Sequence, residues 1–301
     1  MLTIILGFAT SLVYGFADFF GAIASRRIRP VTVTFASGAI GLAFLLALSI
    51  FVGADFSPGA LFWGTAAGIT SAIAMSALYA SLAIGPISVV SPLSAVISAI
   101  VPSIVGFAQG DRFSGLGFAA LAAILVAVVL VGFVPGQDVR LPSPKGLILG
   151  VIAGAGIGVV LICLDQAPAD SGLAPVILLR GSAAAILGAF VLFAFGKAIR
   201  KDLAANEMPG STAGSGAKPK EKVPVKFWYS VAVTGLFDSS ANVFFILASR
   251  IGSLTVVSVL TALYPLGTII LARIFLKEKL ARTQTIGVLF ALGGSALLVI
   301  S

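Results

Sequence analysis

Long apolar runs alternate with short polar breaks along the whole chain. An α-helix needs roughly 20 apolar residues, each rising about 1.5 Å, to cross about 30 Å of hydrocarbon. Breaks such as RRIRP (26–30) and QGDR (109–112) carry the charged and turn residues that end such helices. The pattern predicts an all-α membrane protein with ten transmembrane helices, at residues 2–23, 31–52, 60–83, 87–107, 115–134, 146–165, 173–196, 227–247, 253–275 and 284–300.

Two segments far apart in the chain resemble each other. Residues 84–95 (IGPISVVSPLSA) align with residues 251–262 (IGSLTVVSVLTA) at an offset of 167, with seven of twelve positions identical. Such an internal repeat divides the chain into two halves, residues 1–137 and 138–301, with five predicted helices each. An odd number of membrane helices per half places the two copies in opposite orientations. The chain is therefore predicted to be an inverted repeat.

One stretch, residues 197–226, is rich in Gly, Ser, Ala and Lys and has no periodic apolar face. It predicts a flexible loop inserted between the seventh and eighth helices. The connections after the odd-numbered helices, counted together with Arg273 near the end of the ninth helix, hold 16 Lys and Arg residues, whereas the opposite side holds only Arg112 and Arg250. Because cytoplasmic loops are enriched in basic residues, this loop is expected in the cytoplasm and both termini outside. A multi-pass protein of the plasma membrane, the inner membrane of a bacterium, is expected.

Composition excludes several other classes of protein. The chain is 59% hydrophobic and 10% charged, which leaves too little polar surface for a soluble domain of 301 residues. The net charge of +8 is assigned to the flanks of membrane helices, so no nucleic-acid partner is expected. Residues 1–23 lack a basic start and are expected to remain as the first helix rather than act as a signal peptide.

The residues available for chemistry are few. The chain has one cysteine, Cys163, and no histidine, which argues against a disulfide framework, a metal site or a histidine proton shuttle. It also has no HExxH sequence, no phosphate-binding glycine loop followed by Lys and Ser, and no serine–histidine pairing. No catalytic residue, metal or cofactor is therefore expected, and the protein is not expected to be an enzyme.

Three ionisable residues lie inside the predicted helices: Asp18, Arg180 and Asp238. A charge that faces lipid costs at least a few kcal/mol, so these side chains are expected to face the interior of the bundle. Arg180 needs a carboxylate, and Asp18, Asp238 and Asp165 are its possible partners; an anionic group of a substrate is the alternative. Asp18 shares a helix face with Tyr14 and is the first candidate for proton coupling.

Further polar residues could line a substrate path. Asp238 shares a helix face with Asn242, and the offset of 167 places Asp238 over Ser71 in the other half. Each residue could instead serve helix packing, since small polar side chains also bond to the backbone. The residues predicted to bind substrate, including the serines and aromatic walls of the repeated segments, are Tyr14, Asp18, Ser71, Tyr79, Ser91, Arg180, Asp238, Asn242, Ser258 and Tyr264.

The ends of the two halves carry a recognisable pattern. In the second half the pattern is a Glu, a leucine two positions on, a Gln and spaced glycines: Glu278, Leu280, Gln284, Gly287, Gly293 and Gly294. In the first half Asp111, Arg112 and Phe113 occupy the matching positions, and Gly117 replaces the Gln. With these features the whole chain resembles an EamA-type member of the drug/metabolite transporter superfamily. The resemblance implies ten helices around a central cavity, alternating access, and transport of small metabolites, often amino-acid export.

The expected function is therefore secondary transport of a small molecule across the lipid bilayer. An amino-acid exporter, proton-coupled through Asp18, is the leading hypothesis. Efflux of organic cations or drugs, with Asp18 and Asp238 as counter-charges, is one alternative. A membrane-embedded enzyme acting on a lipid or isoprenoid is another. The sequence leaves open whether the protein is a monomer or a homodimer.

Overall fold

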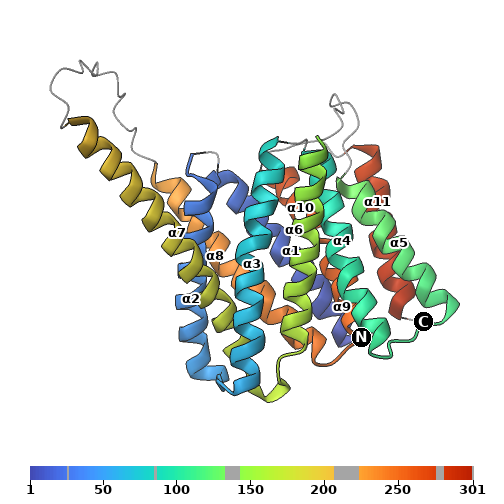
Figure 1. The fold of residues 1–301 in the computed structure, drawn as a ribbon. Helices are drawn as coiled ribbons and strands as arrows, with labels where there is room; N and C mark the ends of the chain where they lie inside the picture. The colour runs from blue at the N-terminus through green and yellow to red at the C-terminus, as the bar shows by residue number, and fades with distance from the viewer. Residues whose placement is uncertain (26, 85–86, 133–142, 207–223, 276–280, 300–301) are drawn as a thin grey trace.

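A computed structural model describes residues 1–25, 27–84, 87–132, 143–206, 224–275 and 281–299. Within these residues the elements are helices, and the only β-type pairing is an isolated bridge between Ala54 and Gly172. The elements are α1 (Leu2–Ser25), α2 (Pro30–Val52), α3 (Pro58–Ile84), α4 (Ile87–Ala108), α5 (Gly115–Gly132), α6 (Pro144–Asp165), the 3-10 turn η1 (Ala169–Ser171), α7 (Ala174–Asn206), α8 (Val225–Ser249), α9 (Leu254–Thr261), α10 (Tyr264–Phe275) and α11 (Arg282–Val299) (Figure 1).

Several helices begin where the sequence supplies a start signal. Pro30, Pro58 and Pro144 occupy the first position of α2, α3 and α6, where a missing N–H costs nothing. Ser143 caps α6 by accepting a hydrogen bond of 3.2 Å from the Gly146 N–H. Ser253 caps α9 in the same way through the Val256 N–H, also at 3.2 Å. These caps satisfy backbone donors that the first turn of a helix leaves free.

Six of the described helices are long and apolar enough to cross a membrane: α1, α2, α3, α6, α7 and α8, with α7 counted over Ala174–Phe193. Large apolar side chains such as Phe51, Leu192 and Phe193 are exposed on the outside of the bundle. An apolar outer surface of this kind is what lipid requires. The fold is therefore that of an all-α membrane protein, while the count of ten transmembrane helices and the inverted repeat remain predictions.

Two predicted boundaries were wrong. Residues 197–206, predicted as the start of a flexible loop, instead continue α7 as a helix to Asn206. The extension is rich in Ala, Lys, Arg and Leu, which all favour helix. The single helix predicted over 253–275 is divided into α9 and α10 at residues 262–263. Pro265 explains the division, since it cannot donate to the Thr261 carbonyl and its ring clashes with that carbonyl in a continuous helix.

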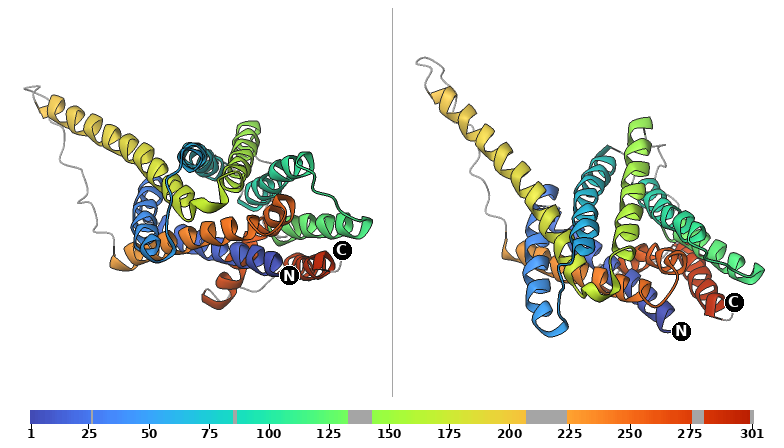
Figure 2. Two further views of the ribbon diagram at one scale, coloured as in Figure 1. Left: turned by 90° about the horizontal axis from the view of Figure 1, so that it is seen from below. Right: turned by 60° about the horizontal axis from the view of Figure 1, so that its bottom comes forward.

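Helix α1 packs against α8 on one side and against α9 and α10 on another (Figure 2). Helices α3, α6 and α7 form a second group, and α5 packs against α11. Glycine permits the closest approach of α1 to α10: a Cβ on Gly15 would lie 2.6 Å from the Cα of Gly267. Close packing of this kind is typical of helices that associate in membranes.

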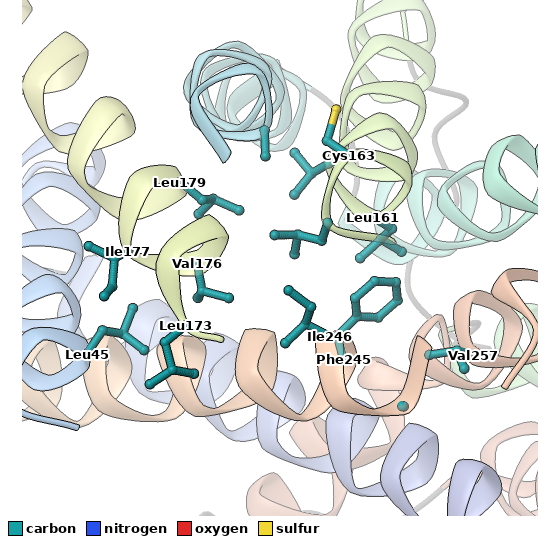
Figure 3. Packing of buried hydrophobic residues seen from close by; sticks show 14 of the residues in the cluster. Leu45, Leu161, Cys163, Leu173, Val176, Ile177, Leu179, Phe245, Ile246 and Val257 are labelled. Atoms are coloured by element: carbon teal, nitrogen blue, oxygen red, sulfur yellow. The ribbon is translucent and has the colours of Figure 1, made fainter. Parts of the chain in front are cut away.

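The largest apolar cluster lies where α6, α7 and α8 meet (Figure 3). Phe245 and Ile246 of α8 point toward Val176 of α7 and Leu161 of α6. All four side chains are buried. This cluster fixes the lower part of α7 against α8, and it thereby sets the distance between the polar residues of those two helices.

Candidate substrate site

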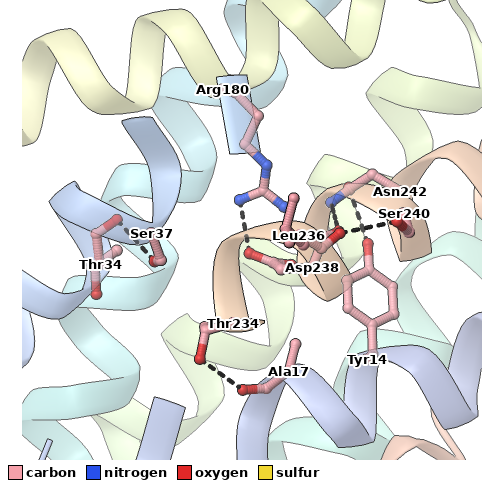
Figure 4. Close-up of polar contacts among 10 residues, drawn as sticks. All are labelled: Tyr14, Ala17, Thr34, Ser37, Arg180, Thr234, Leu236, Asp238, Ser240 and Asn242. Carbon is pink, nitrogen blue, oxygen red and sulfur yellow. Dashed lines mark hydrogen bonds and ion pairs between the residues drawn. The ribbon is translucent and has the colours of Figure 1, made fainter. Parts of the chain in front are cut away.

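Arg180 of α7 and Asp238 of α8 form an ion pair inside the bundle (Figure 4). Arg180 Nη1 lies 2.7 Å from Asp238 Oδ2, and the side chains are 11% and 31% exposed. The sequence left Asp18, Asp238 and Asp165 open as partners of Arg180, and the structure places Asp238 against it. A guanidinium that stays charged at this depth needs such a carboxylate, because its transfer from water is costly.

Asn242 lies one helical turn beyond Asp238 and connects this pair to α1. The Tyr14 hydroxyl donates to Asn242 Oδ1 at 2.9 Å, and Asn242 Nδ2 donates to the Asp238 carbonyl at 2.7 Å. Figure 4 shows the four side chains converging from three helices. We refer to Tyr14, Arg180, Asp238 and Asn242 as the polar cluster. Its members come from three helices that are far apart in the sequence, so only the packing of α1, α7 and α8 brings them together.

Asp18 lies one turn beyond Tyr14 on the same face of α1. Its side chain is exposed, whereas its neighbours Ala17 and Phe19 are only 3% and 4% exposed. Asp18 is within electrostatic range of Asp238, and no described residue donates a hydrogen bond to it or forms an ion pair with it. When both carboxyl groups are ionised, two negative charges face the single positive charge of Arg180. The site then attracts a cationic group or a proton.

Arg180 also retains a hydrogen-bond donor. Its Nε is buried, and no acceptor for it is found among the described residues. A guanidinium carries five donors in a planar fork, and a second carboxylate can bind to those that Asp238 does not use. The site therefore combines a carboxylate without a partner among the described residues, Asp18, with a guanidinium donor that has no acceptor there, the Nε of Arg180.

An aromatic group that the sequence analysis missed lies between α1, α8 and α10. Phe20 of α1 stacks on Phe237 of α8 with 6.3 Å between ring centroids, and Phe16 meets Phe237 edge-on at 5.8 Å. Phe275 of α10 completes the group at 6.3 Å from Phe20. The spacing of Phe16 and Phe20 by four residues and the position of Phe237 beside Asp238 were the available signals. These rings flank the charged residues on two helices.

The other predicted site residues lie elsewhere or outside the described part. Ser71 is half-buried on α3, and Ser258 is buried in α9, where its hydroxyl donates to the Leu254 carbonyl at 2.6 Å. No hydrogen bond among the described residues joins these two serines to the polar cluster. Tyr264 begins α10 beside Gly15 of α1. The side chains of Tyr79 and Ser91 lie outside the described residues. Nor do the described residues include a group of three His, Cys, Asp or Glu side chains suited to hold a metal ion.

Comparisons with known proteins agree with this architecture. The family model described as the EamA-like transporter family matches residues 144–300. A search of curated proteins finds no match. Among solved structures 28 chains match, including a crystal structure described only as that of a protein. That structure is 14% identical to this chain and superimposes with a TM-score of 0.73, over 99% of this chain and 98% of the other. At this identity the likeness concerns the fold alone.

Proposed function

Because the chain belongs to the EamA-like transporter family, and is thereby a membrane transporter of the drug/metabolite type, we propose that it exports amino acids by alternating access. The polar cluster and Asp18 form the substrate site of this proposal. Members of the family are transporters rather than enzymes, so the alternative of an enzyme acting on lipid or isoprenoid is not pursued.

The observation that carries the proposal is the presence of two complementary groups in one site. An amino acid carries a carboxylate and an ammonium group on the same carbon atom. The buried Nε of Arg180 offers a donor for the carboxylate, and the exposed carboxylate of Asp18 offers an acceptor for the ammonium group. Asp238 is paired with Arg180 at 2.7 Å and thereby holds the guanidinium in place.

Proton coupling through Asp18 is part of the same proposal. The chain has no histidine, and Asp18 is an exposed carboxyl group one helical turn beyond Tyr14. A proton on Asp18 would remove the acceptor for the ammonium group. Proton binding and substrate binding would then exclude each other, which is the condition for exchanging one for the other across a membrane. The proposed setting is the plasma membrane, with residues 197–226 in the cytoplasm and both termini outside.

Counterflow in proteoliposomes tests the substrate class. Vesicles that contain the purified protein are loaded with unlabelled amino acid. They are then mixed, in separate experiments, with the radiolabelled amino acid, with the matching decarboxylated amine, or with the matching acid that lacks the amino group. Saturable exchange of the amino acid, with at least tenfold weaker exchange of the two one-charge analogues, is expected. Equal exchange of the amine and the amino acid would contradict the role assigned to Arg180. Arg112→Gln, which changes an exposed arginine outside the described helices, is the matched control for Arg180→Gln.

A second candidate function is efflux of organic cations. It is supported by the excess negative charge of Asp18 and Asp238 and by the aromatic group of Phe16, Phe20 and Phe237, since aromatic faces attract cations. Competition between a cationic dye and an amino acid in the same vesicles separates the two functions. Dye transport that amino acids do not inhibit, lost in Asp18→Asn, would favour this second function.

A further inference from the structure

Two connections that are distant in sequence pair with each other at one end of the bundle. Residues 53–57 join α2 to α3, and residues 166–173 join α6 to α7. Ala54 and Gly172 form an antiparallel bridge. The Asp55 N–H donates to the Ser171 carbonyl, and the Leu173 N–H donates to the Gly53 carbonyl, both at 3.1 Å. The first connection belongs to the predicted first half and the second to the predicted second half, so this pairing ties the two halves together.

Arg250, which directly follows α8, holds the paired connections from a third direction. Its Nη2 donates to the Gly172 carbonyl at 3.0 Å and to the Pro168 carbonyl at 3.4 Å. The guanidinium is half-buried, and burial lowers the pKa of Arg250. The two backbone carbonyls therefore replace part of the hydration that the Arg250 guanidinium loses on burial. We call residues 53–55, 171–173 and Arg250 the Arg250 latch.

Glycine makes the latch compact. Gly172 has a φ of +56°, and a Cβ at this position would lie 2.5 Å from the Gly53 carbonyl oxygen. Gly53 itself has a φ of +87°. Residues with a side chain rarely adopt such backbone conformations. Glycine at position 172 also permits the close approach of the two connections, whereas a Cβ on Gly53 would meet no atom within 4 Å.

The latch lies at the end where α3 and α7 are in contact. At this end a Cβ on Gly64 of α3 would lie 2.7 Å from the Leu178 Cβ of α7. Toward the other end the two helices diverge, as Figures 1 and 2 show. The exposed Asp18 lies beyond the middle of α1 toward that diverging end. The structure is thus closed at the latch, and the bonds that close it are backbone and guanidinium hydrogen bonds that water can replace.

We propose that the Arg250 latch is the gate that closes one end of the transport path, and that it must open in every transport cycle. This gate goes beyond the substrate proposed above, because it concerns the alternating access of any substrate. Arg250 acts as a positioning residue: it holds two connections together and touches no part of the polar cluster in the described structure.

Crosslinking tests whether the latch must open. In a Cys163→Ser background, Asp55→Cys and Ser171→Cys introduce a pair of cysteines next to the bridged residues, at two opposed positions whose backbones share a hydrogen bond. Oxidation is expected to lower counterflow of the amino-acid and cation probes at least tenfold, and reduction to restore it. The two single-cysteine variants under the same oxidant are the controls. Full transport by the oxidised, crosslinked protein would overturn the proposal.

A second measurement does not depend on the substrate. Asp18→Cys in the Cys163→Ser background is labelled with a membrane-impermeant maleimide in sealed vesicles of each orientation. From the latch side, Arg250→Gln is expected to raise the labelling rate at least fivefold, whereas the exposed Arg282→Gln at the opposite end leaves it unchanged. Equal rates for Arg250→Gln and its parent would refute the gate. A response to Arg250→Gln with no amino-acid counterflow would refute the proposed substrate and leave the gate standing.

Discussion

The ion pair between Arg180 and Asp238 can be tested by its effect on stability. Asp238→Asn removes the negative charge and keeps the size of the side chain. It leaves a guanidinium that is 11% exposed without its carboxylate partner. Removing one member of a buried pair costs about 3–5 kcal/mol, and the 31% exposure of Asp238 reduces that cost through water. We expect a loss of about 2–3 kcal/mol in the free energy of unfolding.

The single cysteine supplies the assay. Cys163 is buried, so a fluorogenic maleimide reacts with it as the protein unfolds in detergent. At about 2 °C per kcal/mol for a chain of this size, the expected fall in Tm is about 4–6 °C. Asp55→Asn is the matched control, because the Asp55 side chain is exposed and only its backbone contributes to the latch. Its Tm is expected to stay within about 1 °C of the parent.

Two further variants make the test specific. Replacing both partners, with Arg180→Met and Asp238→Leu, is expected to recover most of the lost stability, since it leaves no uncompensated charge. Asp18→Asn is expected to change the Tm as little as the control does. Two outcomes would refute the claim that Asp238 compensates the charge of Arg180. One is a Tm of Asp238→Asn equal to that of Asp55→Asn, and the other is a fall in Tm for Asp18→Asn as large as for Asp238→Asn.

Three other predictions follow from particular residues. Asp18→Asn is expected to abolish flux driven by a pH gradient while the Tm is kept, and driven flux at the parental rate would rule out coupling through Asp18. Tyr14→Phe removes the hydrogen bond to Asn242 and is expected to raise the KM for counterflow about threefold to tenfold. The free energy of unfolding is expected to fall by about 1 kcal/mol. An unchanged KM would show that Tyr14 is not part of the site. Gly172→Ala is expected to lower the Tm by at least about 2 °C, because Gly172 has a φ of +56° and its added Cβ would clash with the Gly53 carbonyl oxygen. The control Gly38→Ala, which adds a Cβ in open space on α2, is expected to keep or raise the Tm. Similar Tm values for the two variants would contradict the packing of the latch.

The sequence by itself determined the class of the protein and its family. Hydrocarbon thickness fixes how many apolar residues a helix needs, so the long apolar runs predicted the helices. Apart from the longer α7 and the division between α9 and α10, the predicted ends agree with the structure to within a few residues. The resemblance read from the ends of the two halves is confirmed by the family model over residues 144–300. The cost of charge in lipid also singled out Asp18, Arg180 and Asp238 as candidate site residues. Each of these inferences depends on local composition alone.

Only the tertiary structure decided which of these residues meet. Arg180 and Asp238 lie on different helices, and the sequence allowed two other carboxylates as partners of Arg180. The rotation and tilt of each helix are set by packing, such as the cluster of Phe245, Ile246 and Val176 between α7 and α8. The aromatic group and the Arg250 latch were invisible for the same reason, because each joins segments whose distance depends on the whole bundle. Apolar length is encoded residue by residue, whereas the pairing of polar side chains is a property of the assembled helices.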